Sequence, residues 1–210
     1  GVVDIATKNE LMNIEQDEDE INERFYQDLS FGTAGLRGII GAGTNRMNIY
    51  TVGQASQGLA AYVNSVTKNG TIAIAYDSRI KSDTFAKRTA SILAANGIKV
   101  YIYKELAPVP MLSFAVRHLK CDAGVVITAS HNPAKYNGYK AYWEDGAQLP
   151  PEHAQKVSDI IAVTDIFDGV SSIPFEDGIK NGLIKIIGEE VDAAYLENVY
   201  AQAIDTERIK

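Results

Sequence analysis

Residues 71–127 read TIAIAYDSRIKSDTFAKRTASILAANGIKVYIYKELAPVPMLSFAVRHLKCDAGVVI, and this stretch decides the fold. Three short apolar runs, at 71–76, 98–103 and 123–127, are typical of buried strands. The segments between them carry apolar side chains at helical spacing. Parallel strands need crossover connections of this kind, so we expect a largely parallel sheet covered by helices.

The helix between the first two strands has recognisable ends. We expect Ser82 to cap its first turn and Gly97 to occupy the position after its last turn. On the N-terminal side, residues 4–29 predict one polar, acidic helix and residues 50–66 an amphipathic one. The acidic run within the first of these is interpreted as a solvated helix face, because such charge runs usually are.

The segment after the third strand changes character. Asn137-Gly138 and Asp145-Gly146 are turn dipeptides, and they predict a short strand between two turns. The remaining expected elements are a helix at 151–162, a turn-rich segment at 165–182 and a last strand at 183–187.

These elements predict an α/β fold with three layers, α/β/α, around a mixed, largely parallel sheet. We expect a helical extension at 1–30 and a domain boundary near Gly188. The chain starts with Gly1 and ends in an amphipathic pattern without a cap after Lys210. We therefore expect it to be a piece of a longer protein.

Composition limits the function classes. The chain has 210 residues, with 20 Lys and Arg against 27 Asp and Glu, for a net charge of −7. This acidic balance argues against nucleic acid as a partner. No apolar run approaches the roughly 18 residues of a membrane span, and we expect no membrane partner. The single cysteine excludes an intramolecular disulfide and fits a reducing compartment.

Ligands of open α/β sheets bind outside the carboxyl ends of the strands. The loop after the third strand, Thr128-Ala129-Ser130-His131-Asn132-Pro133, concentrates polar side chains at that edge. A Ser-His-Asp triad fits poorly, because sequence neighbours rarely pair as nucleophile and base. A serine near cations suits carriage of a phosphoryl group instead. Taken alone, the loop is equally compatible with a polar turn without chemistry.

A second candidate is the glycine-rich stretch FGTAGLRG at residues 31–38. Its glycines allow close backbone approach, and the guanidinium of Arg37 can bind phosphate through two hydrogen bonds. The following GIIGAG at 38–43 lacks the spacing of a dinucleotide site, and the chain has no P-loop motif.

Together, FGTAGLRG at 31–38 and TASHNPAKYNGYK at 128–140 resemble the first two signature motifs of the α-D-phosphohexomutase family. That family contains phosphoglucomutases and phosphomannomutases. The stretches YDSR at 76–79 and PVP at 108–110 are also similar to family patterns. The resemblance is strongest to the longer, bacterial phosphoglucomutase branch. It implies that residues 31–187 form domain I of the family and that 188–210 begin domain II.

The resemblance implies a reaction. Ser130 would be the phosphoserine of an isomerase that interconverts glucose 1-phosphate and glucose 6-phosphate. The phosphoryl group would pass to the sugar, a hexose 1,6-bisphosphate would turn over in the site, and its other phosphate would return to Ser130. Phosphoryl transfer needs positioning and cationic stabilisation more than covalent help, which agrees with the residue types in both motifs.

The resemblance also implies roles for neighbouring residues. Arg37, His131 and Lys140 match positions that line the reacting phosphate. Lys140 is the first choice for proton transfer to and from the sugar hydroxyl, and His131 the second. Asn132 would shape the loop and contribute to phosphate binding. Arg79 would support the phosphoserine loop and is counted, with Arg37 and Asn132, among the phosphate-binding residues.

Cofactors and partners follow from the same resemblance. We expect Mg²⁺, with phosphorylated Ser130 as one ligand and the others in domain II, and glucose 1,6-bisphosphate as activator. The partners would be a hexose phosphate and the remaining domains, and the location cytoplasmic. We expect the 210 residues alone to be inactive. Two alternatives stay open: a phosphomannomutase or phosphopentomutase of the same family, or a non-catalytic relative that binds sugar phosphates.

Overall fold

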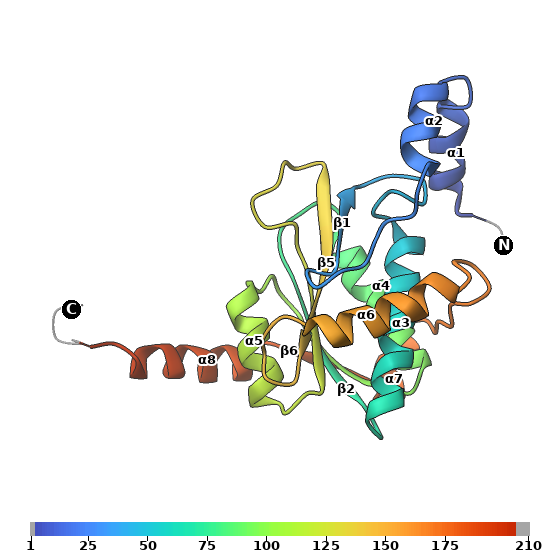
Figure 1. The fold of residues 1–210 in the computed structure, drawn as a ribbon. Helices are drawn as coiled ribbons and strands as arrows, with labels where there is room; N and C mark the ends of the chain where they lie inside the picture. The colour runs from blue at the N-terminus through green and yellow to red at the C-terminus, as the bar shows by residue number, and fades with distance from the viewer. Residues whose placement is uncertain (1–2, 205–210) are drawn as a thin grey trace.

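The computed structural model describes residues 3–204, which form a six-stranded mixed sheet with helices on both faces (Figure 1). The strand order is β1-β5-β4-β2-β3-β6. Neighbours among β4, β2, β3 and β6 pair in parallel, whereas β5 pairs antiparallel with both β4 and β1. This confirms the predicted α/β fold with a mixed, largely parallel sheet. The strands are β1 (Leu36–Ile39), β2 (Thr71–Tyr76), β3 (Lys99–Tyr103), β4 (Ala123–Ile127), β5 (Tyr136–Trp143) and β6 (Ile184–Ile187).

The helices divide between the two faces of the sheet. In Figure 1, α5 and α8 lie on one side, and α3, α4, α6 and α7 lie on the other. Within residues 3–204, no helix is long and apolar enough to cross a membrane. The helices are α1 (Ile5–Asn13), α2 (Glu18–Phe25), α3 (Ile49–Val66), α4 (Ser82–Ala95), α5 (Val109–His118), α6 (Pro151–Val163), α7 (Phe175–Lys180) and α8 (Glu189–Ala201).

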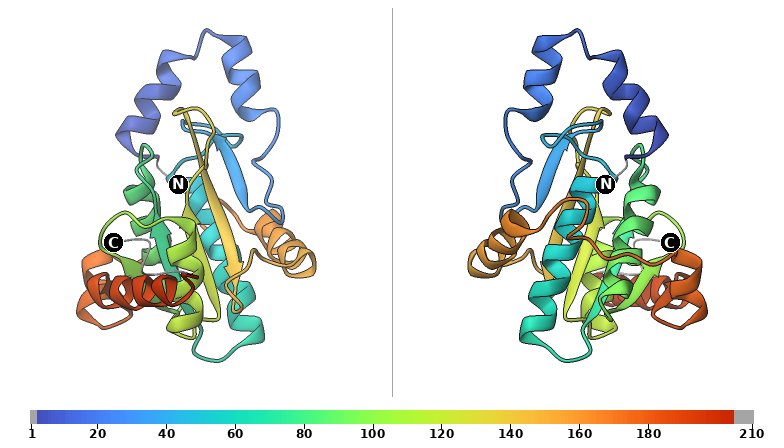
Figure 2. Two further views of the ribbon diagram at one scale, coloured as in Figure 1. Left: turned by 90° about the vertical axis from the view of Figure 1, so that its left-hand side faces the viewer. Right: turned by 90° about the vertical axis from the view of Figure 1, so that its right-hand side faces the viewer.

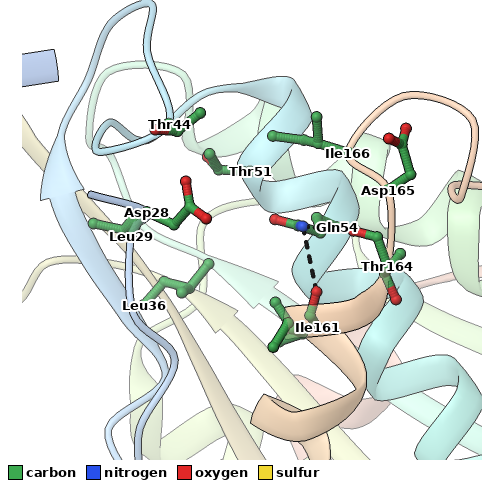
Figure 3. Close-up of a pocket in the computed structure, with 11 residues that line it drawn as sticks. Asp28, Leu29, Leu36, Thr44, Thr51, Gln54, Ile161, Thr164, Asp165 and Ile166 are labelled. Atoms are coloured by element: carbon green, nitrogen blue, oxygen red, sulfur yellow. Dashed lines mark hydrogen bonds between the residues drawn. The ribbon is translucent and has the colours of Figure 1, made fainter. Parts of the chain in front are cut away.

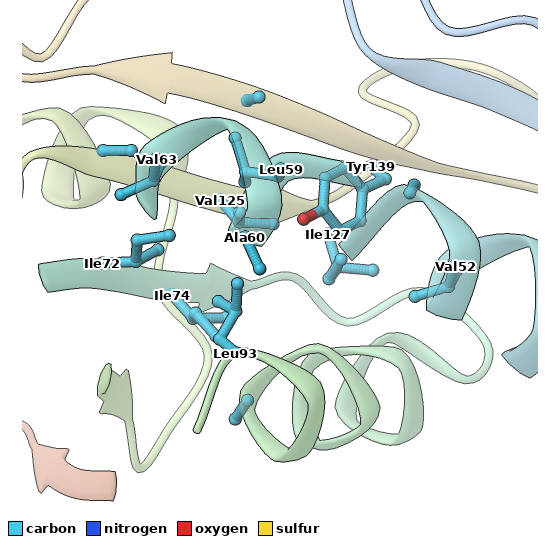
Figure 4. Packing of buried hydrophobic residues seen from close by; sticks show 14 of the residues in the cluster. Val52, Leu59, Ala60, Val63, Ile72, Ile74, Leu93, Val125, Ile127 and Tyr139 are labelled. Atoms are coloured by element: carbon cyan, nitrogen blue, oxygen red, sulfur yellow. The ribbon is translucent and has the colours of Figure 1, made fainter. Parts of the chain in front are cut away.

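The main core lies between the sheet and α3, α4 and α6 (Figure 4). Leu59 and Val63 of α3 pack over Ile72 of β2 and Val125 of β4, and all four are completely buried. Burial of each such side chain contributes about 1.5–3 kcal/mol. A second apolar cluster under α5 covers the opposite face. The strands are therefore packed on both faces, and this fixes the points at which the following loops begin.

The predicted single helix over 4–29 is wrong, because two helices occupy this segment. Asp17 interrupts the pattern, since its carboxylate accepts a hydrogen bond from the Glu20 amide and caps α2. The acidic residues that follow lie in the first turn of α2, where the helix dipole favours them. The two helices form an arch that rises from the rest of the molecule (Figure 2).

Two local expectations need correction, and one strand had not been expected. Asn137-Gly138 is not a turn but part of β5, where Asn137 is fully buried and satisfied by hydrogen bonds. Ser82 is the first residue of α4 rather than its cap, because its hydroxyl donates to Asp77. The second half of the glycine-rich stretch forms β1, which pairs with β5.

Other expected elements agree closely with the structure. The predicted strands at 71–76 and 123–127 coincide with β2 and β4, and Asp145-Gly146 is a turn with φ of +75° at the glycine. Gly97 follows the α4 cap with φ of +77°, as expected. The turn-rich segment also contains α7. The amphipathic pattern at the end of the chain forms α8, and the expected start of a second domain at 188–210 includes residues 205–210, which lie outside the described residues.

Candidate active site

The candidate site lies at the carboxyl ends of β2, β3 and β4, where parallel pairing brings their loops to one edge of the sheet. Two adjoining cavities, of about 360 and about 300 Å³, occupy this edge. Asp77 and Ser130 line both of them. The three loops that follow the strands thus meet at Ser130.

Ser130 has an unusual backbone conformation. Its φ is +55°, in the left-handed region that non-glycine residues seldom adopt. The residue is exposed, and its Oγ lies 3.3 Å from Nδ1 of His131. Strained backbone at a functional position persists only where the surroundings hold it in place. The structure therefore presents a serine hydroxyl to solvent on a firmly held loop.

Strand pairing places two cations beside this loop. Lys140 of β5 lies opposite Val126 of β4, and Arg37 of β1 lies opposite Gly138 of β5. Side chains two residues apart on a strand share a face, so Arg37 and Lys140 are diagonal neighbours on one face of the sheet. Lys140 is paired one residue before the end of β4, and Arg37 is paired two residues after the start of β5, so both cations lie close to the strand ends that flank the Ser130 loop.

The surroundings of Lys140 favour its neutral form. Partial burial lowers the pKa of its amine, and the nearby Arg37 guanidinium lowers it further, while Asp77 opposes the shift. An amine with a lowered pKa is better able to accept a proton near neutral pH. Lys140 can therefore act as a base at this edge of the sheet.

Arg79 binds the backbone of the serine loop. Its guanidinium donates to the carbonyl oxygens of Ser130 (2.5 Å), Asn132 (2.7 Å), Tyr136 (3.1 Å) and Pro133 (3.2 Å). These hydrogen bonds tie Arg79 to the loop backbone, while its expected function in the site stays a prediction. The guanidinium is directed at the loop backbone rather than into open solvent.

Asn132 and His131 are placed differently from each other. Asn132 accepts a hydrogen bond from Arg37 at 3.3 Å, which joins the glycine-rich stretch to the serine loop. His131 is exposed, and its ring contacts the Ser130 hydroxyl. All six candidate residues from the sequence thus lie around one loop.

Sequence reasoning assigned no role to Asp77 and Thr128. Asp77 Oδ2 accepts a hydrogen bond from Thr128 Oγ1 at 2.5 Å, and Thr128 Oγ1 accepts one from the Ser130 amide at 2.9 Å. The sequence signal that could have pointed to them is that each follows directly after a buried strand, β2 or β4. Only the paired register of these strands shows that they meet.

The described residues do not by themselves form a metal site. Within 3–204, no group of three or more His, Cys, Asp or Glu side chains could hold a metal ion. The expectation of Mg²⁺ bound through phosphorylated Ser130, with further ligands from another domain, therefore stays a prediction.

Another cavity, of about 230 Å³, lies away from Ser130, between α3 and the end of α6 (Figure 3). Gln54 uses its amide to donate to the carbonyl oxygens of Thr164 and Ile161. Asp165 accepts hydrogen bonds from the amides of its own turn. These polar groups are committed to structure, and the cavity offers no comparable nucleophile or cation pair.

Comparison with known proteins agrees with this site. Residues 28–166 match the family model for phosphoglucomutase/phosphomannomutase, alpha/beta/alpha domain I. The chain is 42% identical over 184 residues to a phosphoglucomutase of Staphylococcus saprophyticus, covering 88% of this chain and 33% of that protein. It is 44% identical over 164 residues to a probable phosphoribomutase of Schizosaccharomyces pombe, covering 75% of this chain and 28% of that protein.

A solved structure is similar as well. A protein of Thermus thermophilus, assigned as a phosphomannomutase, superposes with a TM-score of 0.70 at 27% identity. The match covers 83% of this chain and 36% of that one. The chain thus spans about a third of the length of the curated relatives it matches.

Fold and site together define an α/β/α domain that presents a serine beside an arginine and a lysine at the carboxyl ends of its strands. The chain belongs to the phosphoglucomutase/phosphomannomutase family, whose members are phosphohexomutase-type enzymes, and most of it corresponds to domain I.

Proposed function

We propose that this chain carries the phosphoserine of an enzyme that interconverts α-D-glucose 1-phosphate and glucose 6-phosphate. The observation that supports this most strongly is the exposed Ser130, held at φ +55° beside Arg37 and Lys140, in a member of this family. Curated relatives named phosphoglucomutase, at 42% identity over 88% of the chain, support the choice of reaction.

In the first half-reaction, the phosphate on Ser130 moves to the free C6 hydroxyl of glucose 1-phosphate. The C6 O–P bond forms, the Ser130 Oγ–P bond breaks, and the hydroxyl proton passes to the neutral amine of Lys140. Oγ leaves with the electron pair and takes up a proton from His131, whose Nδ1 lies 3.3 Å away. The product is glucose 1,6-bisphosphate.

The bisphosphate then changes its orientation in the site, so that its C1 phosphate lies beside Ser130. The second half-reaction is the reverse of the first, carried out at C1. The C1 O–P bond breaks, a new Ser130 Oγ–P bond forms, and His131 takes the serine proton. Lys140 returns its proton to the C1 oxygen. Arg37 stabilises charge on the phosphoryl oxygens throughout, because a guanidinium binds them through two hydrogen bonds.

We also propose that the 210 residues need further domains for turnover. They span about a third of the related enzymes, and their described part lacks a metal-binding cluster. Mg²⁺ would then take one oxygen from phosphorylated Ser130 and its other ligands from elsewhere. The isolated chain is expected to fold and to show no measurable mutase activity. Location in the cytoplasm remains part of this proposal.

The direct test is a coupled assay for glucose 6-phosphate, run on the full-length protein that carries this chain. Ser130→Ala should abolish turnover and leave the affinity for glucose 1-phosphate within about 3-fold, because substrate binding does not depend on the serine oxygen. Ser171→Ala is the matched control, since that serine is exposed and lies outside the site. Full activity of Ser130→Ala would refute the proposal.

The preferred sugar is tested with matching assays for the 6-phosphate of mannose and the 5-phosphate of ribose. The relatives named phosphomannomutase and phosphoribomutase make mannose 1-phosphate and ribose 1-phosphate the alternatives. A larger kcat/KM for either would retain the phosphoserine mechanism and replace the substrate. Binding of sugar phosphates without turnover of any would indicate the non-catalytic relative instead.

A further inference from the structure

The Ser130 loop is fixed by a chain of hydrogen bonds that begins outside it. Asp77, at the end of β2, accepts from Thr128 Oγ1 at 2.5 Å, and Thr128 Oγ1 accepts from the Ser130 amide at 2.9 Å. Thr128 is only 4% exposed, so water cannot readily replace either bond. The orientation of the Ser130 amide is thereby fixed in a residue whose φ is +55°.

Asp77 is itself firmly positioned. Its Oδ1 accepts from the Arg79 amide at 3.0 Å and from the Ser82 hydroxyl at 3.1 Å. Ser82 is 1% exposed and also accepts from Asn137 at 3.0 Å. The other oxygen, Oδ2, lies 3.6 Å from Nε of Arg79, whose remaining nitrogens bind the loop carbonyls. The Asp77 carboxylate thus reaches the Ser130 amide through Thr128 and the loop carbonyl oxygens through Arg79.

We propose that Asp77 and Thr128 are positioning residues for phosphoryl transfer, which act by holding Ser130 in its left-handed conformation. Asp77 holds the threonine hydroxyl so that its lone pair faces the Ser130 amide, and it aligns Arg79 on the loop carbonyls. In this role the two residues act through the loop and need no contact with the transferred phosphoryl group. This inference rests on the proposed function of Ser130.

The same sheet supplies a matched control. At the opposite end of β2, Thr71 Oγ1 donates to Asp122 Oδ2 at 2.8 Å, and the Thr71 amide donates to the same oxygen at 2.7 Å. This Thr–Asp pair also joins β2 to the beginning of β4, but it lies at the end of the sheet away from Ser130. Thr71→Val therefore removes a comparable structural bond without affecting the loop.

The test compares Thr128→Val, Thr128→Ser and Thr71→Val in the full-length protein. Two quantities are measured: the rate of Ser130 phosphorylation by glucose 1,6-bisphosphate, and amide hydrogen exchange in the peptide that contains residues 128–135. Valine has the shape of threonine without its hydroxyl, whereas serine keeps the hydroxyl. Circular dichroism and thermal unfolding show whether each variant is folded.

Thr128→Val should slow phosphorylation by about 10- to 100-fold, because a small misplacement of a reacting group has effects of this size. KM for the bisphosphate should stay within about 3-fold, and exchange in the 128–135 peptide should rise. Thr128→Ser should restore both quantities to within about 3-fold of the parent. Asp77→Asn should also slow phosphorylation and raise hydrogen exchange in the 128–135 peptide. The NH2 group that takes the place of Oδ2 cannot accept the hydrogen bond from the Thr128 hydroxyl.

Each result bears on a different claim. If the parent is phosphorylated and Thr128→Val is phosphorylated equally fast, the positioning role is overturned while the proposed function stands. If Thr71→Val slows phosphorylation as much as Thr128→Val, the effect is general destabilisation and the positioning role is again overturned. If the parent itself is not phosphorylated, the proposed function fails. Separately, unchanged hydrogen exchange in the 128–135 peptide of Thr128→Val would overturn the positioning role.

Discussion

Gly32 and Gly35 lie in the same turn, and only Gly35 needs to be glycine. Gly35 has φ of +77°, and a Cβ there would overlap the carbonyl oxygen of Tyr139 in β5. At Gly32 a Cβ would meet nothing within 4 Å, and its φ is not in the left-handed region. Close approach of this turn to β5 is what brings Arg37 near Lys140.

Gly35→Ala is expected to destabilise the protein by about 1–3 kcal/mol, because the side chain strains the left-handed backbone and displaces β5. Gly32→Ala should change stability by less than about 0.5 kcal/mol. Urea unfolding of the two variants measures the difference. Equal stability of both would show that the turn does not pack against β5 as described.

Lys140 lowers stability in its protonated form. Its pKa is lowered in the folded state, first by burial and then by Arg37, so the unfolded chain binds the proton more tightly. This loss of stability is present in full below the folded pKa. It is relieved as the pH rises from that value towards the ordinary value of 10.5.

Lys140→Met should therefore have a Tm at neutral pH equal to or above that of the parent, while turnover falls by at least about 100-fold. Lys156→Met, on the exposed face of α6, is the control and should leave both quantities unchanged. Calorimetry and the coupled assay measure the two effects. A Tm lower by more than about 4 °C would mean that the charged lysine stabilises the fold.

At the scale of elements, the N-terminal arch is held by polar contacts rather than by a core. Neither α1 nor α2 has a buried residue. Arg24 of α2 binds Glu10 of α1 and Glu20, and it also donates to the carbonyl oxygen of Ala42. The Ala42 amide in turn donates to Glu10 at 3.0 Å. The arch is thus tied to the loop after β1 by this charged cluster and by the ion pair of Arg46 with Glu23.

In acid, the arch should detach from the rest of the domain at a higher pH than that at which the core unfolds. Burial raises the pKa of Glu10, but hydrogen bonds from Arg24 and the Ala42 amide outweigh it and lower the pKa below 4.5. A lowered acidic pKa stabilises the folded state above the ordinary value, and this contribution is lost as the pH falls through the folded pKa. Hydrogen exchange at residues 5–25 should therefore rise below about pH 4.

Arg24→Met should give the same loss of protection at neutral pH, whereas Arg117→Met, which removes an exposed arginine at the end of α5, should not. Protection of β2 and β4 should be unchanged in both variants. Unchanged exchange of the arch in Arg24→Met would contradict the role given to the charged cluster.

The elements show where the sequence was sufficient for prediction and where it was not. The buried strands β2 and β4 were predicted to the residue, because continuous apolar runs bounded by polar turns have few alternatives. Asn137-Gly138 misled, because its turn preference is overridden by burial of Asn137 and by close packing of Gly138 against Thr128. The neighbouring sequence does not show whether an Asn-Gly pair will form a turn or be buried in a strand.

The candidate site shows the same limit. Ser130, Lys140 and Arg37 could be chosen from motifs and from the rule that ligands bind at strand ends. Asp77 could not be given a role, because its contact with Thr128 joins residues 51 positions apart and depends on the pairing of β2 with β4. The left-handed conformation of Ser130 likewise has no sequence signal.

At the scale of the whole molecule, the described residues contain one sheet with two apolar cores, and this supports independent folding of the chain. The purified 210-residue chain should therefore unfold cooperatively on heating. It should show no mutase turnover, because it spans about a third of its relatives. Turnover above about 1 s⁻¹, an ordinary rate for an enzyme, would refute the need for further domains.

The central claim is that Ser130 carries the phosphoryl group, and mass spectrometry of the full-length protein tests it most directly. The protein is incubated with Mg²⁺ and glucose 1,6-bisphosphate, digested and mapped, beside its Ser130→Ala variant. We predict one phosphate on the peptide that contains Ser130, and none on that peptide in the variant. An unmodified Ser130 peptide in a protein that turns over glucose 1-phosphate would contradict the mechanism.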